Sequence, residues 1–598
     1  MDRNTIIAII LCTIVISVGM TIQTTFFAPE ADASVENAAT VEYVADGTSA
    51  SASSGSYIKA TGRDGPSDPF HVVSETLDIT FDPAGGTISS IKTTQHMDGD
   101  KPVELLLSDA DDANAFMLYA GDDINQPIDA IFDYTTSVKS VKDKGDITQV
   151  TFSKDFEIAS TGEKFTIIKS YAVPMSDEYM IQLAVTVKGE DGTVIPLDSY
   201  SGMYTISVGP QVGPEFESLT RNYDYRRVIY KIEKDNSKKI AKYSNGEFSY
   251  SKKPVDWMGL TGKYFAYLLI PETDSIISSV AATQETSDTG ITQKNNIYMT
   301  RSASDSSSVT DIYSFYAGPQ VASYLGRYDK ASDNIFGLSD HNLKKALDVS
   351  WLSWLETILK VVLEAFYLVI PNYGVAIILL TVLVKLLLVP ISKKGLDSTA
   401  KMSALGPKMD EIKAKYADDP QKQNEAMTRL YQEEKINPMG SCLPMFIQFP
   451  IFIALYGLLN KNFELRGAMF IPGWISDLSL PDSVATLPFS LPIIGASIHL
   501  LPIIYTVSMI FSMKITQTTT TQGQKGMMWF MTYGMPIMFF VMMYNAPSGL
   551  LVYWTITNFI SIVQQIWTNK KKGKVYSAEF QAKEEAEKAK KAAKKKRR

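Results

Sequence analysis

Five long apolar stretches lie in the C-terminal part of this 598-residue chain, and Lys385 is the one charged residue within them. They are Tyr373–Ser392, Ser441–Leu459, Pro492–Met513, Met527–Tyr544 and Leu550–Trp567. A helix of about 20 apolar residues crosses the ~30 Å hydrocarbon core of a bilayer, with some tolerance for tilt and local thinning. With a sixth apolar stretch near the N-terminus, the sequence predicts a polytopic α-helical membrane protein of six spans, five of them forming one core.

The sixth stretch, Thr5–Ile22, is longer than the ~7–15 apolar residues typical of a signal peptide and follows a single basic residue, Arg3. A cleavable signal peptide remains the alternative, because Ala31-Asp32-Ala33 is compatible with a cleavage site. We favour an uncleaved transmembrane anchor over residues 1–23.

The region between the anchor and the core is polar, so the mean hydropathy of the whole chain is near zero. Residues 24–65 are rich in Ala, Ser, Thr and Gly and predict a flexible tether. Residues 66–345 contain short alternating stretches separated by turn signals, which predict a large β-sandwich. Examples are Val72–Phe81, Thr148–Phe152, Phe165–Tyr171 and Tyr179–Val187. With four histidines in the chain and no metal-binding spacing or nucleophile motif, we expect neither an enzyme nor a cofactor.

Lys and Arg in short loops predict the orientation of the spans. The 393–440 segment holds 9 basic residues, Lys514 and Lys525 flank the next link on the same side, and residues 569–598 hold 13. The 460–491 loop holds two, and the 545–549 turn holds none. Both termini are therefore expected in the cytoplasm and the β-sandwich outside it.

Four short motifs in the apolar region occur in a specific order and spacing. They are Asn372–Ile378, Lys435–Pro444 running on to Phe452, Trp474–Leu478, and Pro547–Trp554 followed by Asn558 and Gln564-Gln565. Together they resemble the YidC/Oxa family of membrane protein insertases from about residue 350 to 567. Residues 24–345 resemble the large periplasmic domain of this family in double-membraned bacteria, on length, position and strand pattern.

The resemblance implies an insertase core over 350–568 in the inner membrane. It also implies that the core inserts nascent membrane proteins, alone or with the Sec translocon, and takes no small-molecule substrate. One position departs from the family, which usually carries arginine in the first core helix where this chain has Lys385. The positive charge is retained, but the planar bidentate guanidinium is lost.

An insertase has to reduce the cost of moving polar groups through hydrocarbon, which a water-filled groove partway into the bilayer would do. Lys385 is the strongest candidate for a residue that lines such a groove, since inserting a lysine at this depth into the bilayer costs about 3 kcal/mol on insertion scales. The alternative is that its long side chain extends to the interface near Lys393. Thr381 lies one turn earlier on the same face, although its hydroxyl could instead bond its own helix.

The other candidates for the groove are Gln448, Tyr553, Trp554 and Asn558. The resemblance makes Tyr553 and Trp554 a substrate-contacting pair, with an interfacial aromatic belt as the alternative. Methionines crowd one apolar helix at Met531, Met535, Met538 and Met542. Flexible thioethers suit a surface that receives many apolar segments, and lipid-facing filler is the alternative.

Two amphipathic segments complete the core. In Trp351–Leu368 the charged residues Glu356, Lys360 and Glu364 form one stripe, which predicts a helix lying in the outer interface. Residues 393–440 predict a charged cytoplasmic helical hairpin with a break at Asp418-Asp419-Pro420. The tail over 569–598 carries a net charge of +9 (13 basic, 4 acidic) and is expected to contact the ribosome or anionic lipid.

Two other classes of protein share some of these features. A transporter would normally contain internal repeats or paired broken helices, which the core spans lack. A membrane-anchored, carbohydrate-acting enzyme would need paired carboxylates or a histidine site in the β-domain, and none stands out in the sequence.

Overall fold

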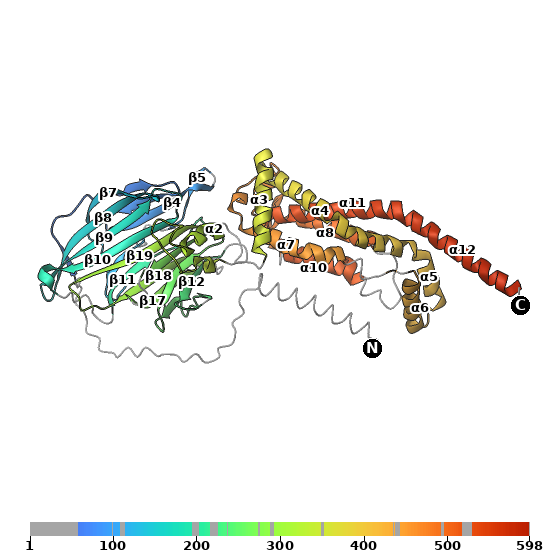
Figure 1. The fold of residues 1–598 in the computed structure, drawn as a ribbon, viewed down its shortest axis with the longest axis horizontal. Coiled ribbons are helices and arrows are strands. Elements are labelled where there is room, and N and C mark those ends of the chain that lie inside the picture. Colours follow the sequence, from blue (N-terminus) through green and yellow to red (C-terminus); the bar gives the residue numbers. More distant parts are fainter. Residues whose placement is uncertain are drawn as a thin grey trace. The chain divides into compact units, whose positions relative to one another are not determined.

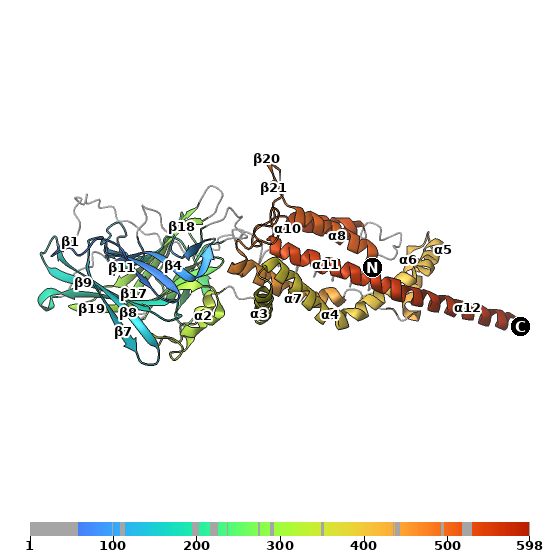
Figure 2. The same cartoon turned by 90° about the horizontal axis from the view of Figure 1, so that it is seen from above.

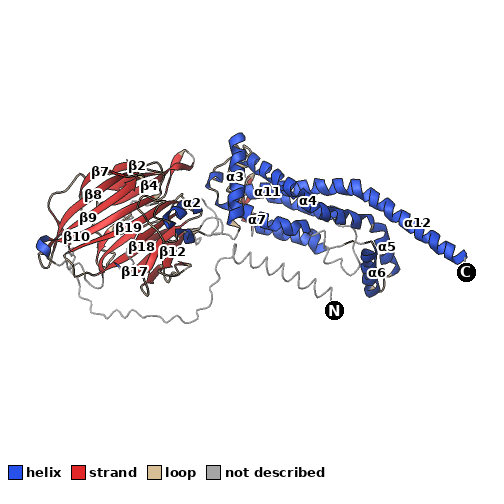
Figure 3. Ribbon diagram, viewed as in Figure 1, coloured by secondary structure: helices blue, strands red, loops and turns tan. Residues whose placement is uncertain are grey.

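A computed structural model of the chain describes residues 58–98, 100–107, 114–193, 202–215, 225–235, 237–272, 276–286, 292–347, 352–434, 436, 443–491, 495–516 and 529–596. The expected first span and most of the expected tether lie outside these residues. The chain divides into two compact units, Met1–Asp348 and Val349–Arg598. The described part of the first is built mainly of strands and that of the second mainly of helices (Figures 1 and 3).

The described part of the first unit contains three antiparallel sheets. The largest has ten strands in the order β1-β8-β9-β10-β19-β16-β15-β12-β13, with β7 also paired to β8. Its strands are β1 Ile58–Thr61, β7 Asp133–Val141, β8 Gly145–Ile158, β9 Lys164–Pro174, β10 Met180–Gly189, β12 Arg227–Ile232, β13 Lys238–Ile240, β15 Val255–Thr261, β16 Phe265–Pro271 and β19 Ser308–Pro319. The second sheet, in the order β14-β17-β18-β11-β6, comprises β6 Leu118–Ala120, β11 Gly202–Val208, β14 Glu247–Tyr250, β17 Ile277–Thr286 and β18 Thr292–Ser302. The third, in the order β2-β3-β4-β5, comprises β2 Phe70–Val73, β3 Leu77–Asp82, β4 Thr87–Asp98 and β5 Lys101–Glu104.

The two smaller sheets pack on the large one, as in the expected sandwich. Tyr204 of β11 donates a hydrogen bond to Asp311 of β19 at 2.7 Å, and Phe81 of β3 packs edge-on against Tyr171 of β9 at 5.1 Å between ring centroids. Along β8, β9 and β10 every second side chain is buried, which is the pattern of strands with one face on a core. Alternation in the sequence therefore predicted this domain correctly.

Two details differ from the sequence expectation. The Val72–Phe81 stretch is not one strand but the end of β2 and most of β3, joined by a turn. The Ser74 hydroxyl accepts hydrogen bonds from the backbone N–H groups of Thr76 and Leu77 and so stabilises that turn. In addition, β1 lies within the range assigned to the tether and pairs with β8.

The second unit is a helical bundle with a short β-hairpin (Figure 2). Its helices are α3 Ser353–Val369, α4 Tyr373–Ala404, α5 Gly406–Lys415, α6 Pro420–Glu433, α7 Leu443–Lys461, α8 Leu500–Thr516, a π-helical turn Phe530–Gly534, α10 Met535–Met543, α11 Ser548–Thr568, a second π-helical turn Asn569–Gly573 and α12 Lys574–Lys596. The hairpin strands are β20 Ala485–Leu491 and β21 Gly495–Ile498.

Among the described helices, the Tyr373–Pro390 part of α4 is the one that is both long and apolar enough to cross a membrane by itself. Leu500–Ile515 and Phe530–Met543 are shorter apolar segments. Helix α11 packs against α4, α7 and α8, so it lies at the centre of the bundle. The helical region is thus present where the apolar stretches predicted it, and the number of spans stays a prediction.

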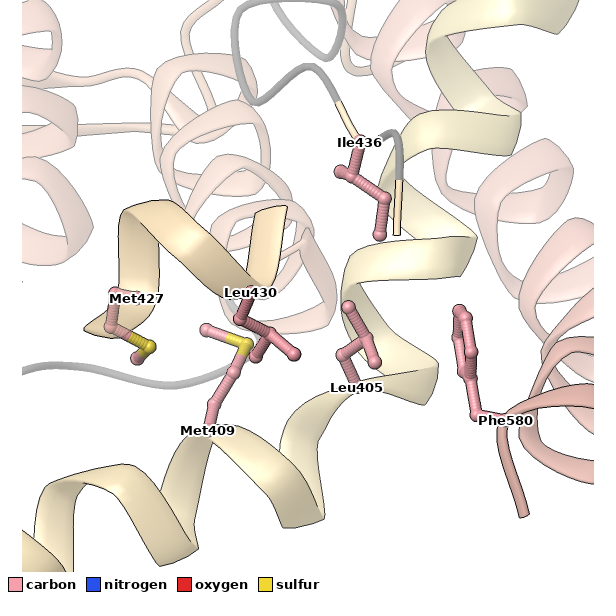
Figure 4. Close-up of a cluster of buried hydrophobic side chains, with 6 residues drawn as sticks. All are labelled: Leu405, Met409, Met427, Leu430, Ile436 and Phe580. Carbon is pink, nitrogen blue, oxygen red and sulfur yellow. The ribbon is translucent and has the colours of Figure 1, made fainter. Parts of the chain in front are cut away.

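The hairpin predicted over 393–440 starts later in the structure, because the apolar helix α4 continues without a break to Ala404; α5 and α6 then form a helical hairpin. The Asp419 carboxylate accepts a hydrogen bond from the backbone N–H of Lys422 at 3.1 Å and caps α6. The basic tail is also helical and packs on this hairpin through Phe580, which is buried with Leu405, Met409, Met427, Leu430 and Ile436 (Figure 4). The sequence analysis treated the tail only as a charged segment and missed this docking residue.

Candidate functional site

The amine of Lys385 is directed into the bundle. It donates hydrogen bonds to Gln448 Oε1 of α7 at 3.1 Å and to Ser561 Oγ of α11 at 2.8 Å. Both acceptors are neutral, and no ion pair to Lys385 is found among the described residues. The side chain therefore joins three helices partway along α4 and does not extend to the end of its helix.

One face of α4 carries Lys385 toward the bundle. Tyr373, Ala376, Ile377, Leu380, Thr381 and Val384 are all buried and recur at helical spacing. Leu386 and Leu387 are largely exposed on another face, as expected for side chains that meet lipid. Thr381 lies on the buried face, and its hydroxyl donates to the carbonyl of Ile377 at 2.6 Å. This hydrogen bond within α4 is the alternative that the sequence left open for Thr381.

A polar stripe runs along α11 at every fourth residue, through Tyr553, Thr557, Ser561 and Gln565. Gln448 lies within interaction distance of the Tyr553 hydroxyl as well as of the Lys385 amine. Sequence analysis missed Ser561, although its place two turns after Tyr553 on the same helical face is a readable signal. The structure thus brings Lys385, Gln448 and Tyr553 together and adds Ser561.

Tyr553 and Trp554 are inside the bundle, with exposed fractions of 2% and 5%. The Trp554 ring stacks on Phe452 of α7, with centroids 5.0 Å apart, and lies 5.7 Å from Tyr505 of α8. This burial argues against a lipid-facing aromatic belt. Because helices of the same chain cover both rings, a substrate segment could contact them only after these helices move apart.

Asn558, about one turn before Ser561 on α11, bonds to α8 and not to Lys385. Its amide donates to the Ser508 hydroxyl of α8 at 2.8 Å, and Ser508 in turn donates to the carbonyl of Tyr505. The residue therefore joins α11 to α8, and the structure does not bring it to the amine of Lys385.

The methionine-rich helix packs against α8. Met531 and Met538 are 44% and 47% exposed, whereas Met535 and Met542 are half-buried. The four residues follow one helical stripe, interrupted by the π-helical turn Phe530–Gly534. They pack on α8 rather than on α4, the helix that carries Lys385, and so form a separate apolar surface.

Two of the family-like motifs lock together at one end of the bundle. The backbone N–H groups of Ser548 and Gly549, at the start of α11, donate to the carbonyls of Leu480 and Leu478 at 2.7 and 2.9 Å. The Ser548 hydroxyl also donates to the carbonyls of Asp477 and Leu480. A Cβ atom at Gly549 would lie 3.1 Å from the Leu478 carbonyl oxygen, which explains a glycine there. These bonds satisfy the otherwise unpaired N–H groups at the helix start.

Helix α3 crosses this same end of the bundle and contacts α4 and α7. Trp354, Ile358, Val361 and Leu368 are exposed on one stripe, while Leu359 and Leu363 are buried. The Glu356 carboxylate reaches α7 at Gly457, where an added Cβ would come within 2.4 Å of Glu356 Oε1. The arrangement is that of an amphipathic helix whose apolar face is exposed in the described part of the second unit.

The site has the chemistry of a binding surface. It offers an amine, an amide and hydroxyl groups within an apolar bundle, which can solvate a polar segment or balance a negative charge. Among the described residues, no group of three or more His, Cys, Asp or Glu side chains could hold a metal ion.

Comparisons with known proteins agree with the motifs. One family model, described as a 60Kd inner membrane protein, matches residues 365–575, and another, the YidC periplasmic domain, matches 70–362. The membrane protein insertase YidC of Treponema denticola is 33% identical over 588 residues, covering 95% of this chain and 99% of that protein. The insertase of the same name from Treponema pallidum is 34% identical over 526 residues, covering 82% and 83%.

A crystal structure of an active YidC insertase with its first transmembrane domain resolved is 18% identical to this chain, covers 85% of it and 93% of that structure, and has a TM-score of 0.34. The resemblance read from the four motifs is confirmed by the family models and the sequence relatives. The chain therefore belongs to the YidC family of membrane protein insertases, inner-membrane proteins with a β-rich periplasmic domain and a helical C-terminal region.

Proposed function

We propose that this insertase moves polar segments of nascent membrane proteins through a hydrated groove whose positive charge is Lys385. The observation that carries the proposal is the position of its amine, bonded to Gln448 and Ser561 in the interior of the bundle. An interfacial lysine would instead extend its amine to the end of its helix.

The two hydrogen-bond acceptors of Lys385 determine what the groove can attract. A carboxylate partner would neutralise the ammonium, whereas amide and hydroxyl oxygens leave its charge free to attract an anionic group. An acidic or polar segment entering the groove could replace these neutral acceptors at little cost, since it brings oxygen atoms of its own. Thr381, Tyr553 and water would then complete the polar lining.

The membrane arrangement that fits this groove has six spans with both termini in the cytoplasm. It rests on the distribution of Lys and Arg and on the apolar stripe of α3, which suits the outer interface. The groove would open to the cytoplasm, on the side on which the hairpin of α5 and α6 follows α4 in the chain.

The apolar part of a substrate needs a separate surface. The exposed methionines Met531 and Met538, with Met535 and Met542 beside them, can adapt to side chains of varied shape. Residues such as Tyr553 and Trp554 would contact the substrate only when α7, α8 and α11 part. We further propose that the Sec translocon cooperates on some substrates and that the basic tail binds the ribosome.

Reconstituted protein and a single-span substrate with an acidic translocated tail would test the groove. Lys385→Ala should reduce insertion of this substrate more than insertion of a version whose tail is neutralised, and Lys385→Arg should retain both. Lys393→Ala, which removes an exposed lysine two turns further along the same helix, is the matched control and should affect both substrates little. Wild-type insertion of the acidic substrate by Lys385→Ala would remove Lys385 from the mechanism.

A further inference from the structure

The hairpin of β20 and β21 projects from the bundle at the start of α8, steeply inclined to the helix axis (Figure 2). Its strands pair antiparallel, with Ala485 opposite Ile498 and Thr486 opposite Ser497. Val484 and Phe489 are 44% and 59% exposed. Within the described part of the second unit, no element covers these two apolar side chains.

Hydrogen bonds to the bundle hold both ends of the hairpin and fix the direction in which it projects. Asp482 Oδ2 accepts hydrogen bonds from the backbone N–H groups of Leu500 and Leu501, at 2.8 and 3.0 Å, and from Trp474 Nε1 at 2.8 Å. On the other strand, Tyr544 donates to the carbonyl of Ser497 at 2.9 Å. The start of α8, Trp474 and Tyr544 thus bind the two ends of the hairpin.

An exposed apolar stripe of α8 begins next to this hairpin. Ile503, Val507 and Phe511 are exposed along one stripe of the helix, as expected for residues that face lipid. The hairpin starts at the Leu500 end of that stripe. Helix α3, whose exposed apolar stripe includes Trp354 and Val361, lies at the same end of the bundle.

Charge and backbone chemistry limit what can cover the hairpin. Residues 483–498 contain no charged side chain, whereas protein interfaces usually carry a polar, charged rim. A two-stranded ribbon also keeps unpaired N–H and C=O groups on both outer edges, which cannot enter the hydrocarbon core without a partner. The head-group layer offers both water for the backbone and apolar contact for side chains such as Phe489.

We propose that strands β20 and β21, with the preceding Val484, form a lipid-binding element that lies in the outer head-group layer, with Val484 and Phe489 directed toward the acyl chains. It would fix the depth of α8 and, together with α3, hold the bundle at two points of the same interface. The inference rests on the membrane orientation proposed above, and its test measures depth without any insertion assay, so the two can fail separately.

Spin labels on the full-length protein in liposomes can measure this depth. After replacement of both native cysteines (Cys12→Ser, Cys442→Ser), Phe489→Cys is labelled and its collision rates with oxygen and with a water-soluble nickel chelate are compared. Val507→Cys on the α8 stripe is the lipid-facing control, and Ser137→Cys, exposed on β7 of the outer domain, is the aqueous control. Val484→Cys provides a second hairpin site should the first substitution disturb the hairpin.

The expected result is a higher oxygen and a lower nickel collision rate at 489 than at 137, with a depth between the two controls. Rates equal to those at 137 would place the hairpin in water and overturn the inference. A label shielded from both reagents would mean that protein covers the hairpin, which would overturn it equally.

Discussion

Phe580 is expected to hold the basic tail on the hairpin of α5 and α6. Its ring is 6% exposed in the cluster formed with Leu405, Met409 and Leu430. Truncating a buried phenylalanine to alanine costs 3–5 kcal/mol in a large core, and we expect about 3 kcal/mol in this small cluster. The nearby ion pair of Lys583 with Glu434, 2.9 Å apart, raises the pKa of Lys583 but is worth at most about 1 kcal/mol, because the lysine is exposed.

Hydrogen exchange of the α5 and α6 amides in the reconstituted protein separates these two contributions. Phe580→Ala should accelerate exchange by on the order of a hundredfold. If the docked hairpin is stabilised by less than this factor, exchange should reach the rate of unprotected amides. Lys583→Ala, the matched control, should accelerate it by about fivefold or less. Unchanged exchange in Phe580→Ala, or a larger effect of Lys583→Ala, would refute hydrophobic docking of the tail.

Three further substitutions test other parts of the structure. Gly374→Val should destabilise the bundle by about 1–3 kcal/mol in thermal unfolding, because a Cβ atom there would come within 2.1 Å of the Phe470 ring; an unchanged midpoint would refute this contact. Asp482→Ala should cost about 1–2 kcal/mol in the same assay through loss of the α8 cap, and Asp482→Asn less; equal loss in both would point to another cause. Burial holds the pKa of Lys169 in the folded protein well below 10.5. The unfolded protein therefore binds this proton more tightly, and the free energy of unfolding should rise as the pH is raised toward 10.5. Pulse proteolysis in urea at about pH 7 and about pH 9 should therefore show a gain that Lys169→Met lacks, and the same gain in both proteins would contradict it.

The sequence predicted elements wherever one pattern dominates. Alternation along β8, β9 and β10 reflects one buried face, and the break at Asp419-Pro420 reflects a proline that suits the first turn of α6. The pattern failed for Val72–Phe81, because the turn depends on local hydrogen bonds of the Ser74 hydroxyl and not on hydrophobicity.

The candidate site was only partly readable from sequence. Lys385 stands out because a charge within an apolar helix is costly, and the structure gives it partners on two other helices. The helical face of Ser561 was readable from its spacing to Tyr553, but its bond to Lys385 was not, since the pairing of α4 with α11 is a tertiary contact between residues 176 positions apart. The same holds for Phe580, a single aromatic residue in a charged helix whose binding site lies on α5 and α6.

Charge reversal at Lys385 shows whether its charge attracts charged or polar segments of the substrate. In proteoliposomes, Lys385→Glu should insert the acidic-tailed substrate more poorly than Lys385→Ala, because like charges repel in a site of lowered dielectric constant. Changing the acidic residues of the tail to lysine should then restore insertion by Lys385→Glu, relative to the wild-type protein. Poor insertion of both substrates by Lys385→Glu, or good insertion of both, would contradict the account.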